Sequence, residues 1–226
     1  MAAKLEWELL VGFEEDIEFL ISRLVECGAH TAKGELDGVR DKLFELRRRN
    51  LVKINHSVIE LLCASYLIRN GYEVDVERRL TDILTCDVYG VKGDGNVIVE
   101  VETGFTPPEH ALDPGTYNKV RIVSKVARYS KFSNKFILGT PPTNILQIPR
   151  LFCKPPRFRM AEELSEMKAL CDRYYTNPPI ELEEIKFGRL YAVYILDVDK
   201  LKVTEVDIDA YVEALSAFPH LAENAR

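Results

Sequence analysis

The sequence lacks a paired cysteine motif, a cluster of histidines and a glycine-rich phosphate loop. Its five cysteines are scattered and odd in number, an arrangement that argues against a zinc site or a secreted disulfide framework. The four histidines stand far apart, and the Gly-Asp-Gly-Asn segment at 93–96 lacks the helix that a phosphate loop requires. These absences disfavour a histidine-based metal hydrolase and a phosphate-loop enzyme.

Long apolar runs are also missing. No stretch approaches the roughly 18 apolar residues of a membrane span, and acidic residues occur too early, from Glu6 onward, for a secretory signal. Hydrophobic residues nevertheless make up 46% of the 226 residues, which suffices for a packed core. We therefore expect a folded cytoplasmic protein without a membrane partner.

Acidic side chains are absent from one long segment. Residues 118–159 carry ten basic side chains and no acidic one, although the whole chain has a net charge of −6. Such a cation cluster provides sequence-independent affinity for phosphates, whereas a merely solvated surface run, the alternative, usually mixes signs. We expect DNA as the partner, recognised through its backbone or its structure. The expected nucleic-acid contacts are Arg121, Lys125, Arg128, Lys131, Lys135, Arg150, Lys154, Arg157 and Arg159.

Hydrophobic spacing predicts an α/β fold with a mixed sheet. Helices are expected at 4–28, 35–49, 55–70, 117–131, 160–175 and from Asp207 to about 218. Strands are expected at 72–80, 86–91, 96–103, 135–142 and 188–198, with a tight turn at 93–96 and a proline-bearing loop at 104–116. The central order is α-β-β-β-α-β, in which the second helix permits a parallel crossover.

This order divides the chain into three expected parts. Residues 1–50 form an N-terminal helical extension, in which two helices make a hairpin. Residues 51–159 form the core, and residues 160–226 form a C-terminal α/β addition packed on that core.

Four carboxylates stand where they can converge. Glu100 and Glu102 are two residues apart on an expected strand, so both point to one face. Burial and mutual repulsion penalise such a pair unless a cation is present. Asp87 lies in the preceding strand, and counting back from the turn brings it level with Glu100 or just beyond. Glu60 lies on the helix before the sheet, with His56 four residues earlier on the same face. A divalent cation, which prefers oxygen ligands, accounts for this arrangement.

The order of these acids resembles the pattern of the PD-(D/E)xK nuclease superfamily. That pattern has an acid on a first helix, an aspartate on one strand and an ExK motif on the next strand. The corresponding residues are Glu60 in HSVIELLCASYLIRNGYEV, Asp87 in TCDVYGV, and Glu100 and Glu102 in VIVEVET. The resemblance covers about 90 residues of the chain and implies a restriction-endonuclease-like α-β-β-β-α-β core.

The chain is most similar in pattern to archaeal Holliday-junction resolvases and related viral or restriction-type endonucleases. In these a Gly-aromatic turn, here Gly71-Tyr72, follows the first helix. The resemblance implies a Mg²⁺- or Mn²⁺-dependent endonuclease that hydrolyses DNA phosphodiester bonds. Asp87 and Glu100 would bind the metal, with Glu60 joining directly or through water. A homodimer suits double-strand cutting, with the N-terminal helices as its interface.

Glu102 departs from the pattern because it occupies the position of the superfamily's lysine. A glutamate cannot supply positive charge in the transition state, although it can accept a proton from the attacking water or bind a second metal. A second interpretation is a lysine supplied from elsewhere: Lys125 on the following helix, which shares a helical face with Arg121 and Arg128. A third is an inactive site kept for binding.

Simpler structural roles are also open for these residues. Glu60 and the basic face of the helix at 117–131 can be solvated, and Asp87 can belong to a turn or a surface ladder. Glu100 and Glu102 can pair with cations across strands, and His56 is more readily a polar neighbour than a ligand. Two rival functions follow: a catalytically inactive DNA-binding module on the nuclease fold, and a structural or protein-interaction domain.

Overall fold

The structure is a computed structural model that describes residues 2–29 and 32–216. It is an α/β fold with seven α-helices and six strands among these residues. The strands form one mixed sheet in the order β1-β2-β3-β4-β5-β6, which confirms the expected fold class. No helix in the described ranges has the length and apolar character needed to cross a membrane.

Backbone contacts divide the chain into two compact units. Unit 1 comprises Met1–Asn96 with Leu196–Thr204, and unit 2 comprises Val97–Ile195 with Glu205–Arg226. The division expected from the sequence, after residues 50 and 159, stays a prediction.

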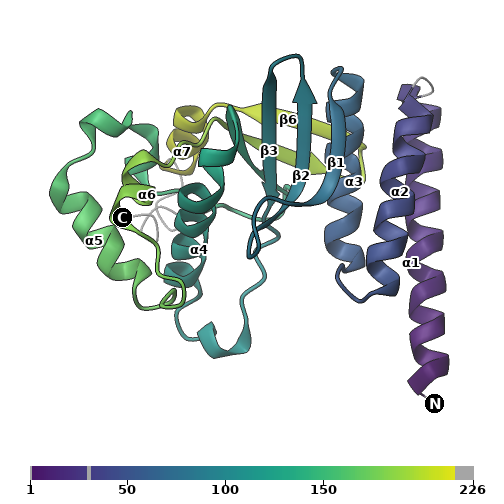
Figure 1. Ribbon diagram of the computed structural model, residues 1–226, viewed down its shortest axis with the longest axis horizontal. Helices are drawn as coiled ribbons and strands as arrows, with labels where there is room; N and C mark the ends of the chain where they lie inside the picture. Colours follow the sequence, from purple (N-terminus) through teal and green to yellow (C-terminus); the bar gives the residue numbers. More distant parts are fainter. Residues whose placement is uncertain (1, 30–31, 217–226) are drawn as a thin grey trace. The chain divides into compact units, whose positions relative to one another are not determined.

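Unit 1 begins with three helices that lie side by side (Figure 1). They are α1 (Ala2–Leu24), α2 (Lys33–Arg48) and α3 (Ile54–Arg69), and a short π-helical turn (Val25–Ala29) follows α1. All three helices are confirmed. Gly28 stands at a φ of 101°, which ends the first helix because a left-handed residue cannot continue it. α3 is buried along most of its length, so it is the central helix of the unit.

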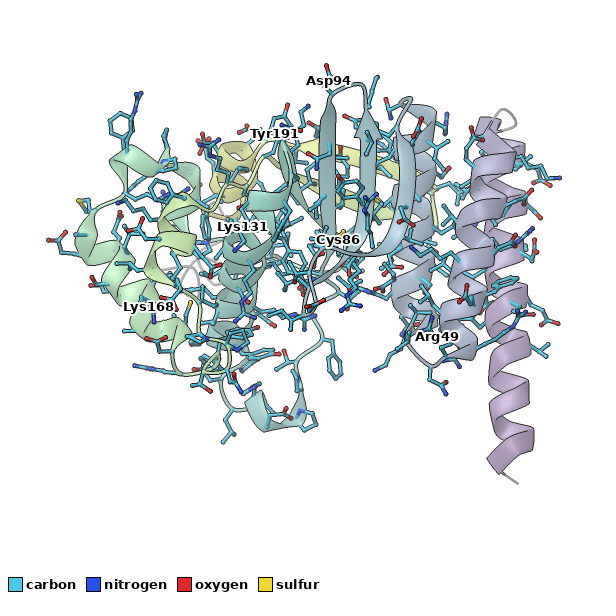
Figure 2. The ribbon with its side chains drawn as sticks, viewed as in Figure 1. Arg49, Cys86, Asp94, Lys131, Lys168 and Tyr191 are labelled. Carbon is cyan, nitrogen blue, oxygen red and sulfur yellow. The ribbon has the colours of Figure 1, made fainter. Side chains whose placement is uncertain are left out.

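Two antiparallel strands follow α3 in unit 1. They are β1 (Glu73–Arg79) and β2 (Thr85–Lys92), paired with Val76 opposite Val88 and Arg78 opposite Cys86. The expected tight turn comes next: Gly93 has a φ of 58°, and Asp94 stands at the tip (Figure 2). Glycine adopts this backbone conformation at little cost.

Unit 2 contains the expected parallel crossover. Strand β3 (Gly95–Val101) runs parallel to β4 (Lys135–Thr140), and α4 (Pro114–Tyr129) connects them. Strand β5 (Ala192–Asp197) continues the parallel pairing next to β4. The apolar side chains of α4 are buried, as their spacing predicts.

Unit 2 also contains a series of short elements. These are the 3-10 helices η3 (Pro108–His110), η4 (Ser130–Phe132), η5 (Arg150–Cys153) and η6 (Pro156–Phe158), and the α-helices α5 (Ala161–Cys171), α6 (Leu182–Phe187) and α7 (Ile208–Ser216). A last strand, β6 (Lys202–Val206), precedes α7.

Three of these elements differ from the sequence-based expectation. Neither α6 nor β6 is expected, because six and five residues are too few for a periodic hydrophobic pattern to be recognised. α4 begins at Pro114, inside the expected loop, because Asp113 caps the helix and proline is well suited to its first turn. The expected end of the last helix, near residue 218, lies outside the described residues.

The expected cap of the last helix is confirmed, and it provides a test of stability. Asp207 Oδ1 accepts hydrogen bonds from the backbone N–H groups of Asp209 and Ala210, at 2.9 and 3.2 Å. Asp207→Ala should therefore lower the free energy of unfolding by about 1 kcal/mol. Asp207→Asn should change it little, since asparagine caps equally well. Urea denaturation of both variants measures the difference, and equal losses would contradict the cap assignment.

Candidate functional site

α3 places a carboxylate in the interior of unit 1. The side chain of Glu60 has no exposed surface, although its helix is otherwise buried through apolar residues. An ionised carboxylate without compensation in such a position costs several kcal/mol. His56, one turn earlier on the same helix, provides compensation: its Nδ1 atom lies 3.0 Å from Glu60 Oε1.

The β1–β2 pair brings two further carboxylates to the same place. The strand register pairs Val76 with Val88 and Arg78 with Cys86, so Glu77 and Asp87 lie opposite each other, although the register does not include them as a backbone pair. Glu77 has a φ of 46°, a left-handed conformation that costs a non-glycine residue roughly 1–2 kcal/mol. Strain of this kind persists where the surrounding structure requires it and is common at functional sites.

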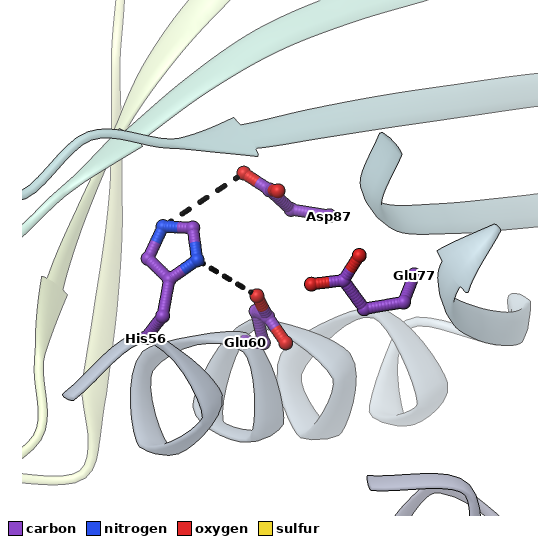
Figure 3. A group of neighbouring side chains, drawn as sticks. All are labelled: His56, Glu60, Glu77 and Asp87. Atoms are coloured by element: carbon purple, nitrogen blue, oxygen red, sulfur yellow. Dashed lines mark ion pairs between the residues drawn. The ribbon is translucent and has the colours of Figure 1, made fainter. Parts of the chain in front are cut away.

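His56, Glu60, Glu77 and Asp87 form what we call the acidic cluster (Figure 3). One ligand atom from each residue lies within 4.8 Å of the others. His56 Nε2 is 4.0 Å from Asp87 Oδ2, so the imidazole ring faces Glu60 through one nitrogen and Asp87 through the other. Glu60 and Asp87 are largely buried, whereas His56 and Glu77 are partly exposed.

The excess negative charge in the cluster changes the acidity of its members. Burial, together with the charges of Glu60 and Asp87, raises the pKa of Glu77 to about 7. Burial also raises the pKa of the Cys63 thiol, with the same two carboxylates contributing. Cys63 is therefore a thiol at neutral pH, and Glu77 takes up a proton near neutrality.

The acidic cluster could hold a metal ion. It offers three carboxylates and one imidazole. Ligands about 2.1 Å from an octahedral ion stand at most about 4.2 Å from one another, so an ion requires only a small contraction of the cluster. A divalent cation would also offset the charge that raises the pKa of Glu77.

Unit 2 contains a second group of charges, the lysine–glutamate cluster of Glu100, Glu102, Lys125 and Arg121. Both carboxylates are buried, and Lys125 Nζ lies 3.1 Å from Glu100 Oε2 and 2.8 Å from Glu102 Oε1. The same ammonium donates to the backbone oxygen of Val101 at 3.0 Å. One lysine from α4 thus compensates two carboxylates at the end of β3.

Further hydrogen bonds hold Glu102 in place. Arg121 Nε lies 3.0 Å from Glu102 Oε1 and its guanidinium also donates to the Phe105 carbonyl. The Glu102 carbonyl accepts from Thr140 Oγ1 and Asn144 Nδ2, both at 3.0 Å. Burial lowers the pKa of Arg121, but Glu102 outweighs this effect and the pKa is raised. Glu102 is accordingly an ion-paired carboxylate with a fixed backbone.

The predicted site residues therefore fall into two groups. Glu60 and Asp87 lie together in unit 1, and Glu100, Glu102 and Lys125 lie together in unit 2. The convergence of all four carboxylates on one pocket stays a prediction.

The sequence alone does not predict His56 and Glu77 as metal ligands. His56 was interpreted as a polar neighbour, but its spacing of four from Glu60 is a signal that the structure bears out. Glu77 was not singled out at all. The available signal is that acidic residues alternate with Val74 and Val76 along this strand. The position of Glu77 opposite Asp87 depends on the strand register, which the sequence does not reveal.

Most of the predicted basic track belongs to the surface of unit 2, with individual partners. Lys131 pairs with Glu184, Lys154 pairs with Glu163, Arg128 donates to the Pro178 carbonyl, and Lys135 lies over the Tyr191 ring. Arg150 and Arg157 are exposed. A role of these residues in DNA binding stays a prediction.

Arg159 requires a correction. Its side chain is 8% exposed, and its guanidinium donates to the carbonyls of Leu151, Lys154, Ile185 and Lys186. Charge alone does not distinguish a cation that faces water from one that binds backbone oxygens. Arg159 connects η5, η6 and α6, and this structural role argues against the predicted phosphate contact.

Comparison with known proteins gives no match: no family model, no curated protein and no solved structure matches the chain. The resemblance to the PD-(D/E)xK superfamily thus rests on the sequence pattern, and it stays a prediction together with the restriction-endonuclease-like topology.

The raised pKa of Glu77 predicts a pH-dependent stability. The folded pKa of about 7 exceeds the ordinary value of 4.5, so the folded protein holds the extra proton in this window. Ionisation of Glu77 then destabilises the fold as the pH rises through the window, and the loss is complete above about pH 7. Glu77→Gln should stabilise the metal-free protein at about pH 8 by about 1–2 kcal/mol, a figure reduced for solvent screening.

At about pH 5 the same substitution should have little effect, because Glu77 is already protonated there in the folded protein. Chemical denaturation with a chelator present measures both values. Glu73→Gln is the matched control, since Glu73 is an exposed carboxylate on the same strand. A Glu77→Gln variant less stable than the parent at about pH 8 would show that the carboxylate is not penalised by its neighbours.

Proposed function

We propose that the protein is a metal-dependent nuclease that hydrolyses DNA phosphodiester bonds. The observation that carries the proposal is the acidic cluster, in which Glu60 and Asp87 lie together with two further metal-ligating groups. Glu60 and Asp87 correspond to the first-helix acid and the strand aspartate of the PD-(D/E)xK pattern. The basic segment of unit 2 supports a phosphate-rich partner.

The donor set of the cluster fits a divalent cation. Asp87 and Glu77 would provide oxygen ligands, and His56 would provide Nε2, the nitrogen that faces Asp87. His56 Nδ1 lies 3.0 Å from Glu60 Oε1, and a carboxylate at this place favours a proton on Nδ1, which leaves Nε2 as the nitrogen that would bind a metal. An imidazole in a carboxylate site favours Mn²⁺ over Mg²⁺. When bound, the ion polarises the scissile phosphate and lowers the pKa of a coordinated water.

Lys125 is the residue to which we assign the role of the superfamily's lysine. Glu102 occupies the lysine position of the pattern, and the Lys125 ammonium lies 2.8 Å from its carboxylate. A lysine that reaches the Glu102 carboxylate from α4 supplies the positive charge that the pattern has at this position of β3, where the superfamily's lysine serves the transition state. Glu102 then orients Lys125, since its own carboxylate is bound to Lys125 and Arg121.

One observation favours the alternative of a catalytically inactive DNA-binding module. Glu100 and Glu102 are both compensated by Lys125, so the lysine–glutamate cluster has no need of a metal for its charge balance. The two functions differ in turnover, because an inactive module binds DNA with or without metal and cleaves no substrate. A homodimer remains part of the proposal for double-strand cutting.

Metal binding is the first test. Mn²⁺ should raise the Tm of the parent protein, and Asp87→Asn, Glu77→Gln and His56→Ala should each lower the Mn²⁺ affinity at least about tenfold, because each removes a ligand. Glu73→Gln, on the same strand but outside the cluster, should leave the affinity unchanged. Titration calorimetry measures the affinities. Parent-like binding by Asp87→Asn would reject the acidic cluster as the metal site.

Glu100→Gln in the same titration tests the other half of the pattern. A comparable loss of affinity would assign Glu100 to the ion that Asp87 binds. An unchanged affinity would restrict the metal to the acidic cluster.

Cleavage of labelled duplex and branched DNA with Mn²⁺ is the second test. Asp87→Asn should reduce the rate at least about 100-fold, because the metal is lost. Lys125→Met should reduce the rate by about 100-fold while leaving Mn²⁺ affinity intact, because the lysine acts on developing charge and does not bind the ion. DNA binding without cleavage of either substrate would establish the inactive module instead.

A further inference from the structure

Unit 2 contains a pocket of about 610 Å³ that none of the proposed catalytic residues lines. Its walls come from η4, η5, η6, the beginning of β4, the end of α6, the segment before β5 and the start of α7. A volume of this size fits an organic group as large as a nucleotide. The lining combines aromatic and basic side chains, and this combination limits what the pocket can bind.

Two of the aromatic side chains that line the pocket are exposed to an unusual extent, while the other two, Phe136 and Phe152, are buried. Phe187 is 54% and Tyr191 is 47% exposed, and both line the pocket. Phe158, 58% exposed, is the neighbour of the lining residue Arg159. Apolar rings left in water at the mouth of a cavity mark a binding surface.

Each of these exposed rings has a cation over its face. Lys135 Nζ lies 4.3 Å from the Tyr191 ring centre, and Lys186 Nζ lies 5.1 Å from that of Phe187. Arg157 lies 4.7 Å from the ring centre of Phe158. An aromatic ring with a cation over its face therefore occurs three times, at two rings that line the pocket and at Phe158, which is next to a lining residue.

More basic than acidic side chains line the pocket itself, and two of the cations, Lys131 and Lys154, are paired with Glu184 and Glu163 outside the lining. Four basic side chains line it, from Lys131, Lys154, Arg159 and Arg189, against the carboxylates of Asp207 and Asp209. Asp207 is engaged in the cap of α7, and Asp209 accepts a hydrogen bond from Cys153. Burial and, to a smaller extent, the charge of Arg189 lower the pKa of Arg159 to about 10. The Arg159 guanidinium is already held by four backbone carbonyls.

We propose that this pocket binds an unpaired nucleotide of a single-stranded nucleic acid segment. The base stacks on Tyr191 or Phe187, and the flanking phosphates contact Lys135, Lys186 and Arg189. Stacking on an exposed aromatic ring next to a cationic groove is how single strands are bound without regard to sequence. A duplex cannot use such a surface, because its bases are already stacked on one another.

This inference rests on the proposed nuclease function and deepens it. It means that the substrate has a single-stranded part, as a flap, an overhang or an open junction has. A partner that is only a backbone-bound duplex would leave the exposed rings without a role.

Fluorescence anisotropy with a labelled oligothymidylate of about 12 nucleotides tests the proposal. The titrations contain a chelator and about 50 mM salt, so that the metal site contributes nothing and electrostatic binding is retained. We expect the single strand to bind at least about tenfold more tightly than a duplex of equal length. Tyr191→Ala and Phe187→Ala should each weaken single-strand binding by about tenfold, and Tyr191→Phe should preserve it, because the ring remains.

Phe19→Ala is the matched control. Phe19 is 65% exposed and carries Arg23 over its ring at 5.9 Å, but it belongs to α1 in unit 1. Its removal should leave the affinity unchanged. Because all three rings are exposed, their removal should not disrupt folding. The Tm of each variant checks this expectation.

Three outcomes would overturn the proposal. They are equal affinity for single strand and duplex, parent-like binding by both Tyr191→Ala and Phe187→Ala, and displacement of the oligonucleotide by a free mononucleotide as effectively as by a longer strand. Asp87→Asn separates this proposal from the nuclease function. It should bind single strands like the parent while failing to cleave, so loss of cleavage and loss of strand binding are observed in different variants.

Discussion

The buried carboxylate of Glu60 is the constraint on which the rest of unit 1 depends. It occupies the middle of α3, a helix covered along most of its length, and it cannot reach water without displacing the core. The imidazole of His56 meets it on one side, and Asp87 and Glu77 extend the polar region to the β1–β2 pair. An apolar residue at this position would make a more stable helix. Local choices that oppose stability in this way are expected at functional sites.

The two charged clusters meet the same physical problem by different means. In unit 2 the carboxylates of Glu100 and Glu102 are compensated by an ammonium that a neighbouring helix provides. In the acidic cluster one imidazole stands among three carboxylates, a surplus of acidic groups. Burial, and then the charges of Glu60 and Asp87, raise the pKa of Glu77. A surplus of this kind attracts a cation from solution, which is why the metal is assigned to unit 1. The lysine–glutamate cluster is already close to neutral, because Lys125 and Arg121 balance its two carboxylates.

Much of this arrangement could be predicted from the sequence, and the rest fails for physical reasons. The helices before β1 and the β3–α4–β4 crossover have long hydrophobic patterns that fix their type, whereas α6 and β6 are too short to show one. Glu60 and Asp87 were identified from the order of the acids, Glu60 on the helix before the sheet and Asp87 across the tight turn from Glu100. Glu77 was missed because its direction depends on a single left-handed residue and on strand register. His56 was undervalued because helical spacing does not show which face meets the sheet. Arg159 was predicted to contact phosphate because a count of charges does not show which backbone carbonyls lie near a side chain.

The left-handed backbone at position 77 also limits which residues evolution can place there. Glycine would relax the conformation and remove the carboxylate, while asparagine and aspartate tolerate it better than glutamate does. Aspartate would even keep the charge, but on a side chain shorter by one methylene. A glutamate at this position, against the preference of the backbone, indicates that the reach of the longer side chain matters. Natural variants would therefore distinguish two requirements at position 77. Glycine there would show that only the left-handed backbone is needed, whereas glutamate alone would show that the long carboxylate side chain is needed.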